Sequence, residues 1–496
     1  MSYLPIEPPP GLSRGGTEYQ AGKPVVRWWD QSLTRWYDRM LGPVGGFRAR
    51  SPSAVAGKAR AMIAWSAAPA TRWIGIGTHT GLYVQNSVGA LFDITPAGLA
   101  PGAADEAVGT GFGLGPFGAG AFGTPRPDTS SSTPASVWDL DLWGGWLQAC
   151  GGWDGTIWEW RGGTGSPALA VAGAPTGCAG IVTAEQGFLL AYGAGGDPRR
   201  IQWCDQGDNT SWTPSTANQA GDVALVTAGK IIKGLKLGPL VLILTDLDAH
   251  VGSYSGLPYV FSFERVGNGC GAIAKGCAVA IGQRAVWWSP SGFWLYDGAI
   301  QPLDCALWDF LSQDLNTGQK SKITGWHNAG HGEVWWHYPS RASAENDRYV
   351  WWDYRRNLWG RGELARLAGA EVSVFKYPLA MGDDGLCYEH EVGDDYGGAT
   401  PFAETGPYEL GDGGQAMRVG ELVCDEAAPG RASISFRTRD RPNGDETAQT
   451  PVTLGADGRG FPRFTARQTR VRVEFAADPA ARLGQMRLGV QPGGRR

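Results

Sequence analysis

From about residue 54 onward, the chain repeats one pattern of apolar and polar positions. A short apolar strand is followed by a turn rich in Gly, Asp or Ser, and then by a second strand that ends in an aromatic residue. Turn residues between short apolar runs are typical of antiparallel hairpins, so the pattern predicts a chain built from β-strands. Seven copies occur, at residues 73–84, 146–158, 188–203, 241–254, 286–298, 334–352 and 379–388.

The spacing of the copies points to a propeller. Five of the six intervals between their starting positions measure 42 to 53 residues, close to the length of roughly 40–50 residues that is typical of a propeller blade. A four-stranded blade cannot bury both faces alone, so blades stack around an axis and close into a ring. We therefore expect an all-β fold with a β-propeller of six to eight blades over residues 54–397, and the seven copies favour seven blades. A pair of β-sandwiches with accidental spacing is the alternative.

The one long interval holds a glycine-rich insert at residues 101–127. Its centre reads GTGFGLGPFGAGAFGT, with Phe112, Phe117 and Phe122 five positions apart. An odd spacing places successive rings on opposite faces of an extended chain, and so dense a run of glycine cannot hold a core. We expect these phenylalanines to contact another subunit. A flexible, solvent-exposed loop is the alternative.

The N-terminal segment, residues 1–53, does not follow the repeat. It contains a proline run and then an aromatic and basic stretch with Trp28, Trp29 and Trp36. Such a composition favours an extended arm that wraps or inserts over a domain of its own. The three tryptophans are therefore candidates for contacts between subunits.

The C-terminal segment, residues 398–496, has a different pattern of alternating strands, such as ASISFR at 432–437. Alternation predicts strands with one buried face, and we expect a β-sandwich-like C-terminal domain. Fourteen arginines lie from Arg418 onward, and twelve acidic residues lie between Glu404 and Asp478. This balance favours a solvated face of mixed charge over a polyanion site.

Composition agrees with an all-β protein. Glycine occupies 76 of the 496 positions, and the 23 tryptophans outnumber the 16 phenylalanines, whereas a helical bundle would be rich in Ala, Glu, Lys and Leu. So many large aromatic side chains need burial or a partner, which argues against a disordered chain. The net charge of −5 excludes a strongly basic nucleic-acid-binding surface as the dominant feature.

Cysteine usage and the N-terminus indicate a soluble protein made in the cytosol. The eight cysteines form no CxxC pair, and we expect buried, reduced thiols rather than a disulfide framework or a zinc site. No basic segment followed by an apolar one begins the chain, and the longest aliphatic run, residues 240–244, is too short to cross a bilayer. No membrane anchor is expected.

The sequence offers weak matches to binding motifs and no strong one. Two overlapping GxGxxG matches begin at Gly113 and Gly118, but neither follows a strand or opens a helix as a dinucleotide site requires. Glycines separate His327, His331 and His337, so a helix presenting two imidazoles to zinc is not expected. We expect no cofactor and no metal.

Carboxylates also give no catalytic pair. Asp205 and Gly207, followed by Trp212, partly match the Asp box of sialidases, but the match occurs once and Trp212 falls two residues late. Nothing pairs two acids as proton donor and nucleophile, and turn capping explains isolated aspartates. We therefore expect no enzymatic activity. Four aspartates that could face a central channel are Asp246, Asp248, Asp297 and Asp304.

Several short segments go beyond a generic propeller. They are RAMI at 60–63, RW at 72–73, GT at 77–78, LY at 82–83, DITP at 93–96, the insert with its closing TPR at 124–126, IQW at 201–203 with Asp208 and Trp212, GFWLYDG at 292–298, WYD at 36–38 before PVGGF at 43–47, ETGP at 404–407 and the closing GGRR. Over nearly the whole chain, these segments resemble the tail hub or nozzle proteins of short-tailed bacteriophages, also called packaged-DNA stabilisation proteins.

The resemblance implies a structural protein of the virion. Such a protein forms a homohexameric ring below the portal and the head–tail adaptor, closes the channel, retains packaged double-stranded DNA and allows its ejection into the host. Its other partners would be tail fibre or spike proteins, in a phage or a phage-derived particle. A mildly acidic chain suits this role, because every phosphate neutralised by the protein would add affinity and slow the DNA. The chain is short for a nozzle, which implies a short tail tip. The alternative function is a carbohydrate-binding or glycan-cleaving propeller in which tryptophans stack on sugars.

Overall fold

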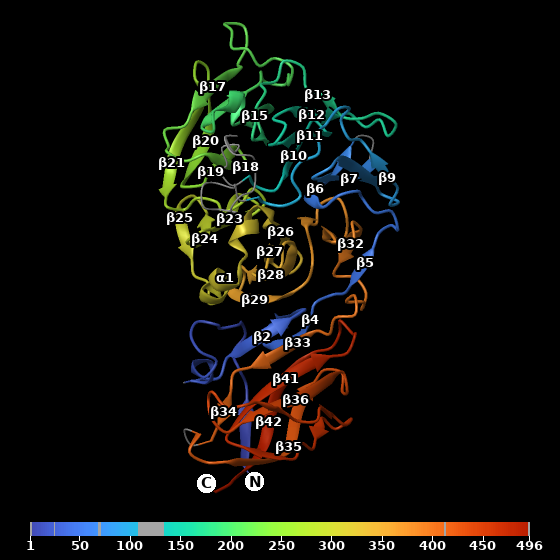
Figure 1. Ribbon diagram of the computed structural model, residues 1–496, viewed down its shortest axis with the longest axis vertical. Helices are drawn as coiled ribbons and strands as arrows, with labels where there is room; N and C mark the ends of the chain where they lie inside the picture. Colours follow the sequence, from blue (N-terminus) through green and yellow to red (C-terminus); the bar gives the residue numbers. More distant parts are fainter. Residues whose placement is uncertain (1, 24, 68–70, 108–132, 411–412, 495–496) are drawn as a thin grey trace, which may run out of the picture.

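The computed structural model describes residues 2–23, 25–67, 71–107, 133–410 and 413–494. Figure 1 shows an elongated molecule with a ring of sheets at one end and a smaller module at the other, where both chain termini lie. Within the described residues the only α-helix is α1 (Trp308–Asp314), and the 3-10 helices are η1 (Gln20–Gly22), η2 (Ala194–Gly196) and η3 (Thr317–Lys322). No helix in these ranges is long and apolar enough to span a membrane.

Seven four-stranded antiparallel sheets, which we number as blades one to seven, form the ring. Blades one to three are β6 (Ala59–Ala67), β7 (Thr71–Thr78), β8 (Leu82–Asn86) and β9 (Leu91–Asp93); β10 (Trp138–Trp143), β11 (Trp146–Gly151), β12 (Ile157–Trp160) and β13 (Leu169–Ala170); and β14 (Gly180–Ala184), β15 (Phe188–Tyr192), β16 (Arg200–Trp203) and β17 (Gly221–Ala224). Blades four and five are β18 (Ile231–Leu237), β19 (Leu240–Thr245), β20 (Asp248–Gly256) and β21 (Val260–Asn268); and β22 (Ala278–Ile281), β23 (Arg284–Ser289), β24 (Gly292–Tyr296) and β25 (Ile300–Leu303). Blades six and seven are β26 (Thr324–Asn328), β27 (Glu333–Pro339), β28 (Asn346–Asp353) and β29 (Leu358–Glu363); and β30 (Ala368–Ala370), β31 (Leu379–Met381), β32 (Cys387–His390) and β5 (Phe47–Ala49).

The blades close on themselves. The first strand of each blade contacts the first strand of the next, from β6 through β10, β14, β18, β22 and β26 to β30, and β30 contacts β6 in turn. A closed circle of seven innermost strands defines a seven-bladed β-propeller. The expectation of an all-β propeller with seven blades is confirmed.

Each of the seven sequence copies corresponds to the two middle strands of one blade. The copy at 286–298 is the hairpin β23–β24, in which Val286 faces Leu295, and the copy at 379–388 spans β31 and the first half of β32. Middle strands pack between neighbouring blades, and β27 is buried along its whole length. Their apolar pattern was visible in the sequence because burial from both faces leaves little room for polar residues.

The seventh blade takes its outer strand from the other end of the propeller sequence. Strand β5 pairs with β32, with Phe47 opposite His390 and Ala49 opposite Tyr388. The propeller therefore begins before residue 54, because its ring is closed by a strand that precedes blade one. This join ties the first and last blades together through backbone hydrogen bonds.

Two further sheets form what we call the two-sheet module, the lower part of Figure 1. One sheet contains β1 (Ser2–Ile6), β3 (Thr34–Tyr37), β4 (Met40–Pro43), β35 (Met417–Glu426), β39 (Arg459–Gly460), β40 (Phe464–Ala466) and β42 (Leu483–Pro492). The other contains β2 (Trp28–Ser32), β33 (Phe402–Thr405), β34 (Tyr408–Glu409), β36 (Ala432–Arg439), β37 (Thr447–Ala448), β38 (Val452–Thr453) and β41 (Gln468–Phe475).

Strands from both ends of the chain build this module. Strand β1 pairs with β42, and β2 pairs with β33. Phe436 of one sheet packs against Phe464 of the other, with ring centroids 5.1 Å apart. The segment 1–53, expected as an extended arm, thus supplies five strands to three sheets, and residues 398–496 do not form their two sheets alone. The physical reason is burial, since apolar N-terminal residues such as Ile6 and Leu41 lie in the same core as the C-terminal strands.

Candidate functional site

Charged side chains cluster on the innermost strands of the propeller, and this cluster is the first candidate for a binding or catalytic site. Asp139 of β10 is 1% exposed and forms an ion pair with Lys233 of β18. Its second carboxylate oxygen accepts hydrogen bonds from Tyr192 and from the backbone N–H of Ile181, the latter at 3.1 Å. Burial and the nearby Asp139 charge raise the pKa of Tyr192 well above its usual value, so this phenol stays protonated. The cluster ties blades two, three and four together.

Lys275 connects two blades that are not neighbours. It precedes β22 of blade five, and its Nζ donates a 2.5 Å hydrogen bond to the carbonyl of Ala179, which precedes β14 of blade three. Burial lowers the pKa of this lysine, and Asp139 partly opposes the shift. This hydrogen bond therefore links two blades that are separated by blade four in the ring.

A second cluster lies where blades one and six meet the start of the insert. Lys322 is 2% exposed, and its Nζ bonds Asp105 at 2.5 Å and Glu345 at 3.0 Å. Arg60 of β6 donates two hydrogen bonds, 2.7 and 2.9 Å long, to the carboxylate of Glu345. The hydrogen bond from Lys322 lowers the pKa of Asp105 below its usual value. We call these four residues (Arg60, Asp105, Lys322 and Glu345) the mouth cluster.

Two of the aspartates considered from the sequence, Asp205 and Asp246, act as turn caps. Asp205 accepts hydrogen bonds from the backbone N–H groups of Gln206 (2.9 Å) and Gln219 (2.8 Å), and Asp246 accepts one from Lys230 N at 2.8 Å. Trp212 is buried. These carboxylates stabilise loops and do not form a pair that could serve as acid and nucleophile.

The three histidines do not converge on one point. His327 lies 3.2 Å from Glu371 and 3.1 Å from the Tyr354 hydroxyl. His337 is fully buried and stacks on Trp326, and burial lowers its pKa to about 3. Burial also lowers the pKa of His331 to about 4. Among the described residues, no group of three or more His, Cys, Asp or Glu side chains could hold a metal ion.

All eight cysteines are buried and unpaired by disulfides, as the sequence predicted. Burial raises the pKa of their thiols, to about 11 for Cys277 and about 12 for Cys387. At neutral pH they are therefore protonated and poor nucleophiles. They fill space in the core.

The joint between propeller and module is a buried polar network that no sequence pattern predicted. Arg35 of β3 lies between two carboxylates, bonding Glu333 of β27 at 2.8 Å and Glu391, just after β32, at 2.6 Å. Burial raises the pKa of Glu333, whereas at Glu391 the adjacent guanidinium outweighs burial and lowers the pKa. Trp36 packs against Trp351, with ring centroids 5.8 Å apart.

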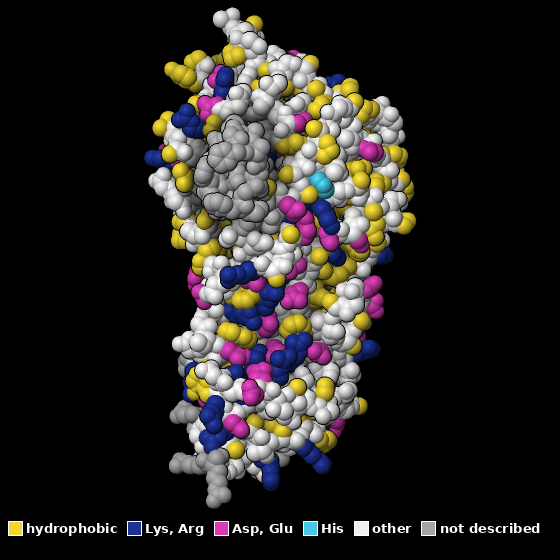
Figure 2. Space-filling model, in the orientation of Figure 1, with side chains coloured by type: hydrophobic (Ala, Val, Ile, Leu, Met, Phe, Trp, Pro, Cys, Tyr) yellow, Lys and Arg dark blue, Asp and Glu magenta, His cyan; other side chains and the backbone are white. Residues whose placement is uncertain are grey.

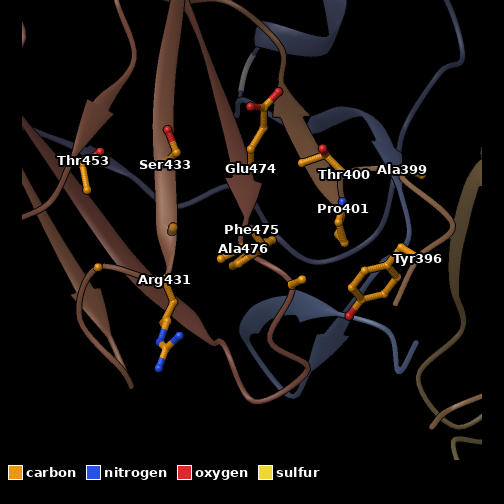
Figure 3. Close-up of a pocket in the computed structure, with 13 residues that line it drawn as sticks. Tyr396, Ala399, Thr400, Pro401, Arg431, Ser433, Thr453, Glu474, Phe475 and Ala476 are labelled. Atoms are coloured by element: carbon orange, nitrogen blue, oxygen red, sulfur yellow. The ribbon is translucent and has the colours of Figure 1, made fainter. Parts of the chain in front are cut away.

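A pocket of about 420 Å³ opens on the two-sheet module, where β36 begins and β41 ends (Figure 3). Its polar groups already have partners: Arg431 pairs with Asp478, Glu474 accepts a 2.7 Å hydrogen bond from Arg472, and the Tyr396 hydroxyl donates to Val44 O. In Figure 3 Arg431 and Glu474 lie apart on different strands rather than converging. The pocket presents no set of groups suited to catalysis.

Two of the three tryptophans expected at subunit contacts lie inside the chain instead. Trp28 and Trp36 are buried in the core of a single chain, so their side chains are not available to a neighbour. This expectation was wrong for both residues, because they pack inside the module and the joint. Trp29 is half-buried, and the Arg14 guanidinium lies 5.0 Å from its ring. Phe112, Phe117 and Phe122 lie outside the described residues.

Tryptophan burial bears on the expected glycan-binding alternative. Seventeen of the 23 tryptophans are buried, and a ring buried on both faces cannot stack on a sugar. Among the described residues the most exposed tryptophan is Trp146, at 38%, and the Arg161 guanidinium lies over it at 4.3 Å from the ring. The tryptophans of this chain are mainly core residues.

No family model matches the chain, and no curated protein matches it either. Solved structures of similar arrangement include a streptogramin B lyase, which is 9% identical, has a TM-score of 0.42, and aligns over 69% of this chain and 96% of its own. Virginiamycin B lyase from Staphylococcus aureus is 9% identical with a TM-score of 0.40, over 67% and 94% of the two chains. The β-propeller domain of Cps50 (Swd1) from Myceliophteria thermophila is 9% identical with a TM-score of 0.39, over 70% and 99%. At such identities these likenesses bear on the fold alone.

Proposed function

We propose that the protein is a structural, non-catalytic component of a bacteriophage tail. It would be the hub or nozzle that forms a six-fold ring below the portal and adaptor, retains packaged double-stranded DNA and releases it into the host. The proposal combines the sequence resemblance with the arrangement of the molecule, in which charged side chains join structural parts together and none forms a catalytic group among the described residues.

One observation carries the proposal: the propeller and the two-sheet module are locked into a single body. Arg35 is 2% exposed and bonds two carboxylates of the propeller. The backbone N–H of Leu33 donates to the hydroxyl of Tyr349 at 2.7 Å. A buried ion pair with full hydrogen bonding fixes geometry more than it adds stability. A closure that resists the pressure of packaged DNA needs that rigidity, whereas a catalyst needs an open site.

The propeller channel itself is a poor passage for DNA in this proposal. Lys275 links blade five to blade three, and the Asp139 cluster joins blades two to four at their innermost strands. The DNA path would then follow the axis of the ring of subunits. Each subunit would contribute one outer face to that path rather than its central hole.

The proposal also needs a surface that joins neighbouring copies in a closed, head-to-tail ring. The tip of the β20–β21 hairpin offers apolar side chains that the described residues leave exposed, since Leu257 is 71% and Tyr259 is 80% exposed. Large exposed apolar groups of this kind mark interaction sites. We propose that this tip contacts the adjacent subunit.

Light scattering and negative-stain microscopy test the function directly. The full chain, alone and mixed with the portal and adaptor of its own genome, is expected to form six-fold rings that attach to the adaptor. A chain that stays monomeric under every condition and never binds the adaptor would contradict the proposal. A glycan array and a hydrolysis assay form the complementary test, and a strong glycan signal would favour the carbohydrate-binding alternative instead.

A further inference from the structure

Several arginines of the two-sheet module pair with carboxylates. Arg470 pairs with Glu18 and Glu404, and Arg472 pairs with Glu404 and Glu474. Figure 2 shows the resulting mixture of basic and acidic side chains over the middle and lower parts of the molecule. The mixed face expected from the sequence is thus present. Further pairs are Arg431–Asp478, Arg437–Glu446, Arg439–Glu18 and Arg459–Glu421.

Two exposed arginines that form no ion pair with a described residue, Arg418 and Arg463, line one groove. The groove, of about 360 Å³, lies on the outer face of the sheet that contains β35, β40 and β42. Arg418 and Arg463 line it together with Thr465 and Gln491, and its floor includes Phe464. No Asp or Glu lines the groove, and neither arginine forms an ion pair with a described residue. Two unmatched positive charges in a shared depression raise the local concentration of anions.

The strand register brings these donors close together. On β35, Arg418 is directly opposite Thr465 of β40 on one side and Gln491 of β42 on the other. Residues opposite one another in a sheet project from the same face, about 5 Å apart. Arg463 immediately precedes β40, two residues before Thr465, and lines the same groove. Two guanidinium groups, a hydroxyl and an amide can therefore reach one small ligand.

We propose that this groove binds a phosphate group, and that the phosphate belongs to the backbone of double-stranded DNA. Arginine, threonine and glutamine are the side chains that proteins use to contact phosphate oxygens, and the planar guanidinium matches an oxyanion in a bidentate way. The phosphate chemistry stands on the groove alone. The choice of DNA as its source rests on the proposed tail function. A single groove with two cations neutralises few phosphates, so it would orient DNA beside the subunit without holding it tightly.

Fluorescence anisotropy with a labelled DNA duplex tests the groove in the full-length protein. The double variant Arg418→Gln/Arg463→Gln is expected to weaken binding on the order of tenfold to a hundredfold near 0.1 M salt, and to reduce the slope of log affinity against log salt by about 2. The variant Arg418→Lys/Arg463→Lys keeps both charges and is expected to retain most of the affinity. Unchanged affinity and slope in the glutamine variant would overturn the proposal.

A matched control separates the groove from general charge. Arg431→Gln/Arg437→Gln also removes two exposed arginines of the same module, but both are paired with carboxylates, so duplex binding is expected to change less than threefold. At equal ionic strength, inorganic phosphate should displace the duplex better than chloride does. Equal binding of poly-glutamate, with equal loss in the glutamine variant, would indicate an acidic protein surface and overturn the choice of phosphate.

The outcomes also separate the groove from the tail role. Ring formation of the glutamine variant is measured by light scattering, and the exposed positions of both arginines predict that it is unchanged. Rings that form while duplex binding is unaffected by the substitutions contradict the groove only. A monomeric protein that loses duplex binding in the glutamine variant contradicts the tail function only.

Discussion

Lys322 is a buried cation, and its contribution to stability depends on the acceptors around its Nζ. Asp105, Glu345 and the carbonyl of Ala344 all accept hydrogen bonds from its Nζ. Lys322→Met removes the cation and leaves the Glu345 carboxylate with Arg60 alone. Breaking a buried ion pair costs about 3–5 kcal/mol, and since Arg60 remains, we expect a loss of about 3 kcal/mol of unfolding free energy in urea titrations.

The control for this prediction is Lys58→Met. Lys58 pairs with Asp383, but both side chains are at least a third exposed, and surface pairs of this kind contribute about 0–1 kcal/mol. If both variants lose the same stability, the mouth cluster is not a buried ion pair in solution.

His337 makes stability depend on pH. Its folded-state pKa is about 3, because burial and the charge of Arg366 disfavour protonation, whereas an unfolded histidine titrates near 6.5. Below pH 6.5 the unfolded chain therefore takes up a proton that the folded chain refuses, and stability falls as pH falls. At pH 5 this single residue is expected to cost about 2 kcal/mol relative to pH 8.

The variant His337→Phe isolates that effect. The phenylalanine can stack on Trp326 as the imidazole does, but it has no proton to bind. Unfolding free energies at pH 8 report the change in packing, and the drop from pH 8 to pH 5 is expected to be about 2 kcal/mol smaller in the variant. Equal drops in both proteins would show that His337 titrates normally.

Residue-level features were predictable from sequence where partners are close in the chain. The turn aspartates could be assigned as caps because Asp208 accepts from Thr210, two positions on. Arg35 could not be assigned, because its partners Glu333 and Glu391 lie 298 and 356 residues away. No local pattern marks such a contact, and only the closed fold brings the three charges together.

At the scale of elements, the blade strands differ in how visible they are. Middle strands such as β23 and β27 are almost wholly buried, so their apolar runs stand out. Some outer strands are short, with three residues in β9 and two in β13, and these carry no distinct pattern. The sequence places β5 in an extended arm, because no pattern in its three residues predicts that it pairs with β32.

Closure by β5 predicts that blade seven opens when this strand is weakened. Phe47 is buried against His390 and Tyr396, with ring centroids 4.6 and 6.0 Å away. Phe47→Ala removes these contacts and is expected to cost about 3 kcal/mol. Hydrogen exchange should then quicken first in β30, β31 and β32. Phe92→Ala in the outer strand of blade one, where the ring is half-buried, should cost about 1 kcal/mol and leave blade seven protected.

At the scale of the whole molecule, the two ends of the chain and its middle form different parts of the fold. Strands from residues 2–43 and 402–492 share two sheets, and strands from residues 47–390 form the ring. The repeat in the sequence was sufficient to predict the propeller, because each copy of the repeat is the buried middle hairpin of one blade. It was insufficient for the module, whose sheets combine strands such as β1 and β42 that lie about 480 residues apart.

Assembly into a ring is the property that the hairpin tip would control. The double variant Leu257→Ser/Tyr259→Ser replaces two exposed apolar side chains, so the fold and its unfolding free energy should change by less than about 0.5 kcal/mol. If the tip contacts the adjacent subunit, the variant should sediment as a monomer at concentrations where the parent protein is a hexamer. Val88→Ser is the matched control, since Val88 is 83% exposed at a turn of blade one and should leave the hexamer intact. Hexamers of undiminished stability in the double variant would place the subunit contact elsewhere, and loss of the hexamer in both variants would point to general surface apolarity rather than to this tip.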